Sequence, residues 1–291
     1  MQPRLSTFSL VAWDPVDRAW GVAVASKFPA VGARVPWAAS GAGAVATQSY
    51  ANTTFGPRGL TAMAAGHSAQ RTLDELLAAD PERERRQVGL IDARGQSATF
   101  TGRECQAWAG GRAGPGYAAQ GNILAGAQVV DALTDTFLGA AGDLPGRLMA
   151  ALLAADRAGG DRRGRQSAAL YVAKAGAGYG GLDDIWIDYR VDDHPDPVHR
   201  LAELLDIHRL YFGKSPPEDE LPLDGETLLQ LQTIARRLGH YRGDVHGLYD
   251  APTRAALEAW IGSENFEDRT DFGRRRIDRP VFEYLRTRFG Q

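Results

Sequence analysis

Apolar and polar residues alternate at the start of the chain. In residues 7–12 every second residue is apolar, which is the period of a β-strand. Residues 14–17, Asp-Pro-Val-Asp, are typical of a turn, and a second apolar run follows at 19–25. The pattern predicts a hairpin with Lys27 just beyond its far end. A run of small residues at 43–48 predicts a third strand.

Helical periodicity then appears in pairs. Pro57 can open a helix that ends near Gly66, and Ser68 can cap a second one that stops before Asp80-Pro81. A second helical pair is expected around 129–141 and 148–155. We also expect strands at 87–92, 96–101, 117–120, 167–173 and 184–190, and a closing helix at 197–212.

The order of these elements bears on the fold class. Helices arrive two at a time rather than one after each strand, which argues against a doubly wound parallel sheet. The pattern therefore predicts an α+β fold. Two antiparallel sheets with helix pairs outside would fit it, and so would a single layered sheet.

The composition changes at residues 213–220, where Pro-Pro and an acidic run cannot continue a helix. We therefore predict two domains, 1–212 and 213–291. The second should be a small all-α module, with helices around 228–238, 253–260 and 280–288. Its core is small, so we expect it to pack against the larger domain and to be stabilised by that contact.

Charge and cysteine content narrow the classes of function. The net charge of −3 gives no electrostatic reason to expect a nucleic-acid partner. The single cysteine, Cys105, excludes an internal disulfide, and its surroundings favour a half-buried small side chain over a catalytic one. No apolar run approaches the roughly 20 residues that span a bilayer, and residues 1–7 do not resemble a secretory signal. We therefore expect no membrane association and a cytoplasmic protein.

Five segments of the first domain carry recognisable motifs. They are 7–12 (TFSLVA), 21–27 (GVAVASK), 48–52 (QSYAN), 120–122 (QGN) and 161–167 (DRRGRQS). Together, in this order, they resemble the functionally uncharacterised, Ntn-hydrolase-like family whose members usually open close to Met-Thr-Phe-Ser. The likeness covers residues 6 to 212 and implies a four-layer αββα Ntn-hydrolase-like sandwich.

The resemblance also implies a chemistry. In such hydrolases an N-terminal Thr, Ser or Cys attacks a carbonyl, and its own α-amine takes the proton. Here Thr7 would be the nucleophile. Lys27, one of only three lysines, would lower the pKa of the amine, and Asn122 would donate to the oxyanion. Asp161 and Ser167 would orient the amine.

The same resemblance suggests substrate contacts. Gln48, Asn52 and Arg163 are the candidates, and Arg163 would favour a carboxylate. The expected partner is a small amide or peptide substrate, and no cofactor is expected.

Each of these residues also has a structural interpretation. Thr7 can be an ordinary residue on a strand face, and Lys27 a solvated strand end. Asn122 after a glycine is often a turn residue. The 161–167 segment can equally be a loop held by local ion pairs.

The position of Thr7 raises a further question. Six residues precede it, so its α-amine is not free in the sequence as given. Trimming, a wrongly assigned start, or a fold that has lost the nucleophile's role would each account for this. A wrongly assigned start is slightly favoured over trimming.

Residues 192–196 together with His199 contain ligand types for a metal. Their spacing is irregular, however, and aspartates before prolines commonly cap helices, so we favour capping and expect no metal. The C-terminal segments 231–250 and 253–257 resemble peptidoglycan-binding-like domains. Tyr241, Tyr249 and Trp260 could stack on sugars there, although helical spacing favours core positions.

Two functions remain open at this point. The first is an Ntn-type amidohydrolase or peptidase acting on a small amide. The alternative is a non-catalytic binding or scaffold protein that uses both domains, with peptidoglycan as the weaker choice of ligand. The C-terminal module would then mediate packing or contacts in a homo-oligomer.

Overall fold

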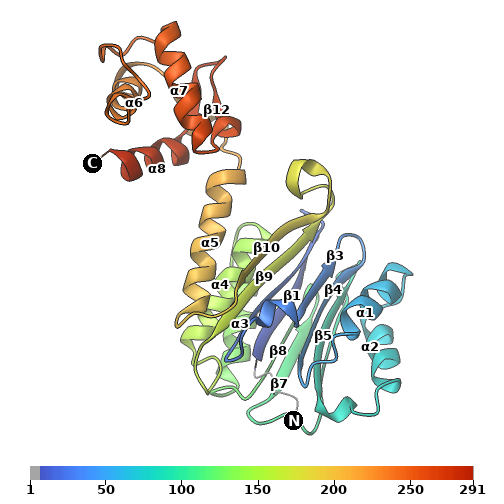
Figure 1. Ribbon diagram of the computed structural model, residues 1–291. Helices are drawn as coiled ribbons and strands as arrows, with labels where there is room; N and C mark the ends of the chain where they lie inside the picture. Colours follow the sequence, from blue (N-terminus) through green and yellow to red (C-terminus); the bar gives the residue numbers. More distant parts are fainter. Residues whose placement is uncertain (1–6, 291) are drawn as a thin grey trace. The chain divides into compact units, whose positions relative to one another are not determined.

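The computed structural model describes residues 7–290, and the chain divides into two compact units, residues 1–205 and 206–291. The first unit is a mixed α/β body built on two antiparallel sheets (Figure 1). Among the described residues, none of the helices combines the length and the apolar character needed to cross a membrane.

The larger sheet of the body has six strands in the order β10-β9-β2-β1-β8-β7, and all its neighbouring strands are antiparallel. The four-stranded sheet has the order β3-β4-β5-β6. The strands of the larger sheet are β1 (Thr7–Asp14), β2 (Ala19–Ser26), β7 (Gly110–Gly114), β8 (Tyr117–Asn122), β9 (Ser167–Lys174) and β10 (Ile185–Val191). Those of the smaller one are β3 (Pro36–Ala39), β4 (Gly43–Ser49), β5 (Arg86–Asp92) and β6 (Ser97–Thr101).

One helix pair covers each sheet. Helices α1 (Phe55–Ala64) and α2 (Ala69–Ala78) pack on the four-stranded sheet, and α3 (Gln128–Gly139) and α4 (Leu144–Arg157) pack on the six-stranded sheet (Figure 1). The two sheets face each other, with β4 and β5 against β1 and β8, β3 against β2 and β9, and β6 against β7 and β8. The body ends in α5 (Pro197–Phe212), and the division between the units falls within this helix.

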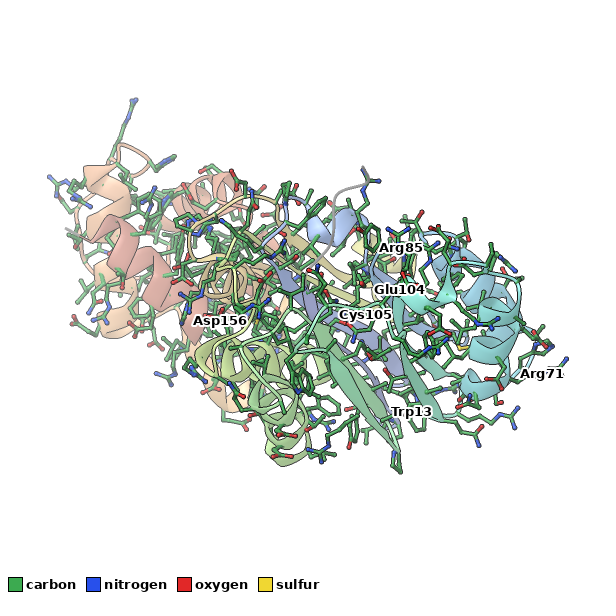
Figure 2. All side chains as sticks on the ribbon, turned by 90° about the horizontal axis from the view of Figure 1, so that it is seen from below. Trp13, Arg71, Arg85, Glu104, Cys105 and Asp156 are labelled. Atoms are coloured by element: carbon green, nitrogen blue, oxygen red, sulfur yellow. The ribbon has the colours of Figure 1, made fainter. Side chains whose placement is uncertain are left out.

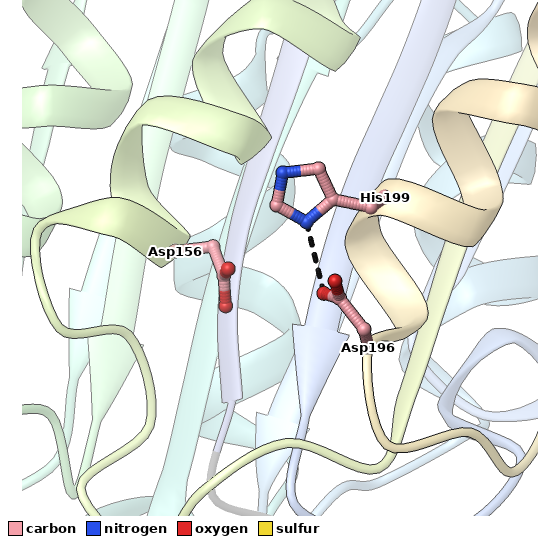
Figure 3. Close-up of side chains that lie close together, drawn as sticks. All are labelled: Asp156, Asp196 and His199. Atoms are coloured by element: carbon pink, nitrogen blue, oxygen red, sulfur yellow. Dashed lines mark hydrogen bonds and ion pairs between the residues drawn. The ribbon is translucent and has the colours of Figure 1, made fainter.

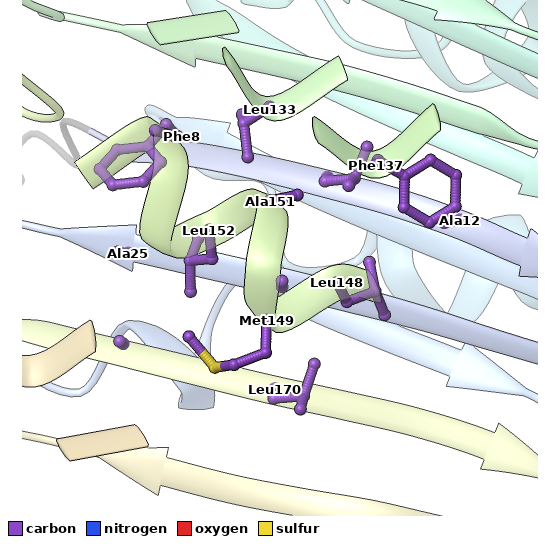
Figure 4. Close-up of a cluster of buried hydrophobic side chains, with 14 of the residues drawn as sticks. Phe8, Ala12, Ala25, Leu133, Phe137, Leu148, Met149, Ala151, Leu152 and Leu170 are labelled. Carbon is purple, nitrogen blue, oxygen red and sulfur yellow. The ribbon is translucent and has the colours of Figure 1, made fainter. Parts of the chain in front are cut away.

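The alternation of the first strand explains this layering. Phe8, Leu10 and Ala12 point into an apolar core shared with α3 and α4, where they meet side chains such as Phe137 and Leu152 (Figure 4). Val11 belongs to a different cluster, which lies between the two sheets. Burial of both faces of the strand is what fixes its register.

The start of one helix agrees with the sequence prediction, and the start of another does not. Ser68 caps α2 by accepting a hydrogen bond from the Arg71 N–H, as predicted. The prediction that Pro57 is the first residue of α1 is wrong, because α1 begins at Phe55. Proline is tolerated throughout the first turn, where backbone N–H groups have no partner within the helix, so its presence does not fix the first residue.

The second unit is not all-α, which corrects our prediction. Besides α6 (Gly225–Arg237), α7 (Ala251–Ser263) and α8 (Arg279–Phe289), it contains a three-stranded antiparallel sheet. Its strands are two or three residues long, too short for an alternating pattern to appear in the sequence. They are β11 (Glu220–Pro222), β12 (Thr270–Asp271) and β13 (Arg276–Asp278).

The aromatic residues of this second unit are mainly structural. Trp260 and Tyr241 are buried in its core, and the Tyr249 hydroxyl donates to the Phe272 carbonyl at 3.0 Å. Buried rings cannot stack on a sugar, so Trp260 and Tyr241 hold the fold together.

Short 3-10 helices occur in both units. They lie at Val31–Ala33, Arg83–Arg85, Tyr179–Gly181, Pro217–Asp219 and Glu267–Arg269.

Candidate functional site

Four polar residues form a row across the six-stranded sheet. Thr7 on β1 is paired with Ser26 on β2 and with Asn122 on β8, and Ser26 is paired with Ser167 on β9. Directly paired residues of antiparallel strands point to the same face. All four side chains are at most 2% exposed. The row Asn122–Thr7–Ser26–Ser167 is therefore a continuous line of buried polar groups.

The turn between β1 and β2 sets this register. Asp14 accepts hydrogen bonds from the backbone N–H groups of Val16 and Asp17, at 2.8 and 3.0 Å. Arg18 completes the turn with a φ of 50°. Because Asp14 then pairs with Ala19, each earlier residue of β1 has a fixed partner, and Thr7 meets Ser26.

The hydroxyl of Thr7 faces the space between the two sheets. Its Oγ1 lies 3.4 Å from Ser26 Oγ, and its carbonyl accepts a hydrogen bond from Gln48 Nε2 at 3.2 Å. The same face carries Ser9, whose hydroxyl donates to Gln48 Oε1 at 2.6 Å. Thr7 itself is fully buried.

Glutamine side chains continue this polar group across the sheet interface. Gln87 Oε1 accepts from both Gln48 Nε2 and Asn122 Nδ2, each at 2.9 Å. Gln120 Nε2 donates to the Ser9 hydroxyl at 2.7 Å. The amides of Gln48 and Asn122 therefore have partners already, and Gln48 lies inside the protein rather than on a cavity wall.

Lys27 follows Ser26 directly, but its ammonium points elsewhere. Lys27 is exposed, and its Nζ donates to the Arg165 carbonyl at 3.1 Å. Its backbone N–H donates to Asp161 Oδ2 at 2.7 Å. The residue that pairs with Thr7 is thus Ser26, and Lys27 joins the row to the loop at 161–165.

Asp161 organises that loop. Its carboxylate also accepts from the backbone N–H of Arg163 at 2.9 Å and forms an ion pair with the Arg163 guanidinium at 3.1 Å. Arg163 Nη2 donates to the Lys27 carbonyl at 3.0 Å. The guanidinium of Arg163 is therefore held by Asp161.

Ser167 and Asn52 have separate partners. Ser167 Oγ donates to the Phe28 carbonyl and accepts from the Val31 N–H at 3.1 Å, which fixes the loop after β2. Asn52 Nδ2 donates to Asp80 Oδ2 at 3.0 Å, in a cluster by the four-stranded sheet. The structure brings Thr7, Asn122, Gln48 and Ser167 together and places Asn52 elsewhere.

Two residues of this site were not anticipated. The sequence motif points to Lys27, whereas the residue opposite Thr7 is Ser26, a pairing that the four-residue turn between the strands fixes. Gln87 had no sequence signal, because it lies on the other sheet and only the packing of the sheets brings it to Asn122.

Cys105 lies on the segment that precedes β7 (Figure 2). Burial raises the pKa of its thiol, so the thiol stays protonated near neutral pH. Its Sγ–H donates to the Arg86 carbonyl at 3.3 Å. A protonated, partly buried thiol is a poor nucleophile, in agreement with the expected structural role.

A cavity of about 430 Å3 opens on the helix-covered side of the six-stranded sheet. Phe8, Ala25 and Ser26 lie on its wall, together with Asp161 and Arg162 from the loop after α4. Of the polar row, the cavity thus touches Ser26, one of its two inner members.

Asp156, Asp196 and His199 lie together near this cavity (Figure 3). Their ligand-type atoms lie within 4.8 Å of one another, which is a spacing that a metal ion could use. However, Arg165 Nε donates to both oxygens of Asp156, at 2.8 and 3.0 Å, and Asp196 Oδ1 is 2.9 Å from His199 Nδ1. The positive charge beside Asp156 is thus supplied by Arg165. Asp196 directly precedes α5, and its carboxylate contacts the His199 ring.

Comparison with known proteins gives separate matches for the first and the second part of the chain. Residues 211–285 match a family model described as "Putative peptidoglycan binding domain". A crystal structure of protein SPO2555 from Silicibacter pomeroyi is similar, with a TM-score of 0.64 and 30% identity over 70% of this chain and 89% of that one. No curated protein matches. Residues 7–201 match the model of the family of unknown function DUF1028, and the chain belongs to that family.

Proposed function

We propose that the body is an N-terminal-nucleophile amidohydrolase that acts on a small amide substrate through Thr7. The observation that carries the proposal is the row Asn122–Thr7–Ser26–Ser167 at the end of β1, which places the Thr7 hydroxyl beside a second hydroxyl and an amide. The layer order, helices outside two packed antiparallel sheets, is the one that the Ntn-hydrolase-like resemblance implies. This chemistry needs a form of the protein in which Thr7 is the first residue.

The roles follow from the chemistry of amide cleavage. Thr7 Oγ1 attacks the carbonyl carbon, and the free α-amine of Thr7 takes its proton and passes it to the departing amine. The C–N bond breaks and an ester on Thr7 remains. Water, activated by the same amine, hydrolyses that ester and restores the hydroxyl.

Neighbouring groups would position this reaction. Ser26 Oγ, 3.4 Å from Thr7 Oγ1, is placed to relay the proton. Asn122 Nδ2 would donate to the oxyanion after leaving Gln87. Asp161 would hold the end of β2 through the Lys27 N–H. The Lys27 ammonium is exposed and donates to the Arg165 carbonyl, so we assign it no role beside the amine.

A comparison of three proteins tests the proposal. A chain that begins at Thr7 should release amine from a panel of dipeptides and aminoacyl anilides. The same chain with Thr7→Ala should be slower by about a thousandfold or more, and Thr7→Ser should keep part of the activity. The 291-residue chain should be inactive, because its Thr7 has no free α-amine. Equal rates for the Thr7-first chain and its Thr7→Ala variant would refute the proposal.

A second candidate function is ligand binding without turnover. One observation favours it: the amides of Gln48 and Asn122 already have buried hydrogen-bond partners. Such bonds are typical of groups that stabilise the fold rather than take part in a reaction. The match of residues 211–285 makes peptidoglycan the first ligand to test for the second unit. Absence of retention on insoluble peptidoglycan would remove that ligand.

A further inference from the structure

The cavity at the ends of β1 and β2 has the features of a small-molecule site. Its volume of about 430 Å3 lies in the range of roughly 300–1,000 Å3 that such sites occupy. Phe8, Ala25 and Val198 form an apolar part of its wall, and all three side chains are at most 3% exposed. An aliphatic group would fit against this part.

The charged part of the wall contains three arginines and two aspartates. Asp156 is paired with Arg165, with Arg165 Nε 2.8 Å from the carboxylate. Asp161 is paired with Arg163, which lies just outside the wall. Both aspartates are therefore neutralised by neighbouring guanidinium groups.

Arg157 and Arg162 are the remaining charged residues of the wall. Both are exposed, and within the described part of the chain neither guanidinium has an acidic partner. Lys27 adds a third cation close by, since its Nζ donates to the carbonyl of Arg165 on the wall. An anion at this position would meet positive charge without having to displace a carboxylate.

A cation is the less suitable occupant. In the nearby group of Asp156, Asp196 and His199, Asp156 is already bound by Arg165, and the carboxylates of Asp156 and Asp196 raise the pKa of that arginine. A metal ion would have to displace the guanidinium from Asp156. The charge balance of the wall therefore points to an anionic ligand.

We propose that this cavity binds a small organic anion, with an aliphatic body against Phe8, Ala25 and Val198 and its anionic head at Arg157 and Arg162. Guanidinium groups recognise carboxylate and phosphate alike through paired hydrogen bonds, so either can supply the head. Arg163, which sequence reasoning chose as the carboxylate contact, is held by Asp161, whereas Arg157 and Arg162 are free for this role. The site does not depend on turnover at Thr7.

Calorimetric titration of the full-length chain with hexanoate, hexanamide and inorganic phosphate tests the site. Hexanoate should bind, and the R157Q/R162Q double variant should bind it at least about tenfold more weakly. R34Q/R58Q is the matched control: it removes two exposed arginines of the body that do not line this cavity, and it should bind like the wild type. Hexanamide, which has the same body without the charge, should bind much more weakly than hexanoate.

The other outcomes are equally informative. Binding of phosphate but not hexanoate, lost in R157Q/R162Q, would keep the anion site and assign a phosphoryl head. No binding of either anion, equal affinity for hexanamide, or the same affinity in both double variants would overturn the proposal. Shifts of the Gly159 and Gly164 amide resonances on titration would locate the ligand at the cavity wall. A Thr7→Ala chain should bind hexanoate normally, which separates this site from the proposed hydrolase.

Discussion

Individual buried charges in the body are matched by specific partners. Asp80, which follows α2, is 5% exposed and lies 2.8 Å from the Nε of Arg86. Burial alone would raise the pKa of the Asp80 carboxyl. Hydrogen bonds from Arg86, Asn52 and the Glu82 N–H outweigh burial and lower the pKa to about 2. Asn52 therefore helps to keep the Asp80 carboxyl ionised.

This shift predicts a pH dependence of stability. A carboxyl whose pKa falls from 3.8 to about 2 on folding stabilises the protein above pH 3.8, and that contribution is lost as the pH falls toward 2. It amounts to about 2.5 kcal/mol. Asp80→Asn should destabilise the body by about 2–4 kcal/mol at pH 7, because Arg86 loses its buried partner. The variant should also lose less stability than the wild type between pH 4 and 2.

Urea unfolding followed by tryptophan fluorescence measures this effect, since all tryptophans except Trp260 lie in the first unit. Asp74→Asn is the control, because Asp74 is an exposed residue of α2 and should leave the free energy of unfolding almost unchanged. Parallel pH profiles for wild type and Asp80→Asn would contradict the assignment.

At the scale of elements, close contact between a helix and a strand decides where glycine is needed. A Cβ added to Gly56 of α1 would lie 2.3 Å from the ring of Trp37 on β3. A Cβ on Gly139, the last residue of α3, would meet nothing within 4 Å. There is therefore room for a side chain at Gly139 but not at Gly56, although both glycines lie in helices.

Alanine substitution at these sites should have opposite effects. Gly56→Ala should destabilise the body by about 1–3 kcal/mol, because the Trp37 ring must move. Gly139→Ala should stabilise it by roughly 0.5–1 kcal/mol through helix propensity alone. Thermal unfolding of both variants provides the measurement. A stabilising Gly56→Ala would show that α1 does not pack on β3 as described.

The elements that sequence reasoning found share a physical cause. The hairpin of β1 and β2 and the paired helices bury one face or both. Apolar residues therefore recur along their sequences at the spacing of a strand or a helix. β3 begins with a proline and β7 is glycine-rich, and neither alternates in a recognisable way. Their pairing with β4 and β8 comes from tertiary contacts that local pattern does not encode.

At the scale of the whole molecule, the candidate site depends on contacts distant in sequence. The pairing of Thr7 with Ser26 can be predicted from the sequence, because a four-residue turn fixes the register of the two strands. The link between Asn122 and Gln87 was not, because it joins two sheets whose packing no local pattern specifies. The sequence motif favours Arg163 as a substrate contact, but only the structure shows that Asp161 neutralises its charge.

The central claim is that Thr7 is a nucleophile once it is the first residue. Treating the Thr7-first chain with a β-lactone and mapping the adduct by mass spectrometry tests it most directly, because ring opening leaves the whole lactone on the attacking atom. We predict a single adduct on Thr7, which is absent from the full-length chain and from Thr7→Ala. A Thr7-first chain that stays unlabelled, or that is labelled at Ser26 or Cys105 instead, would contradict the account.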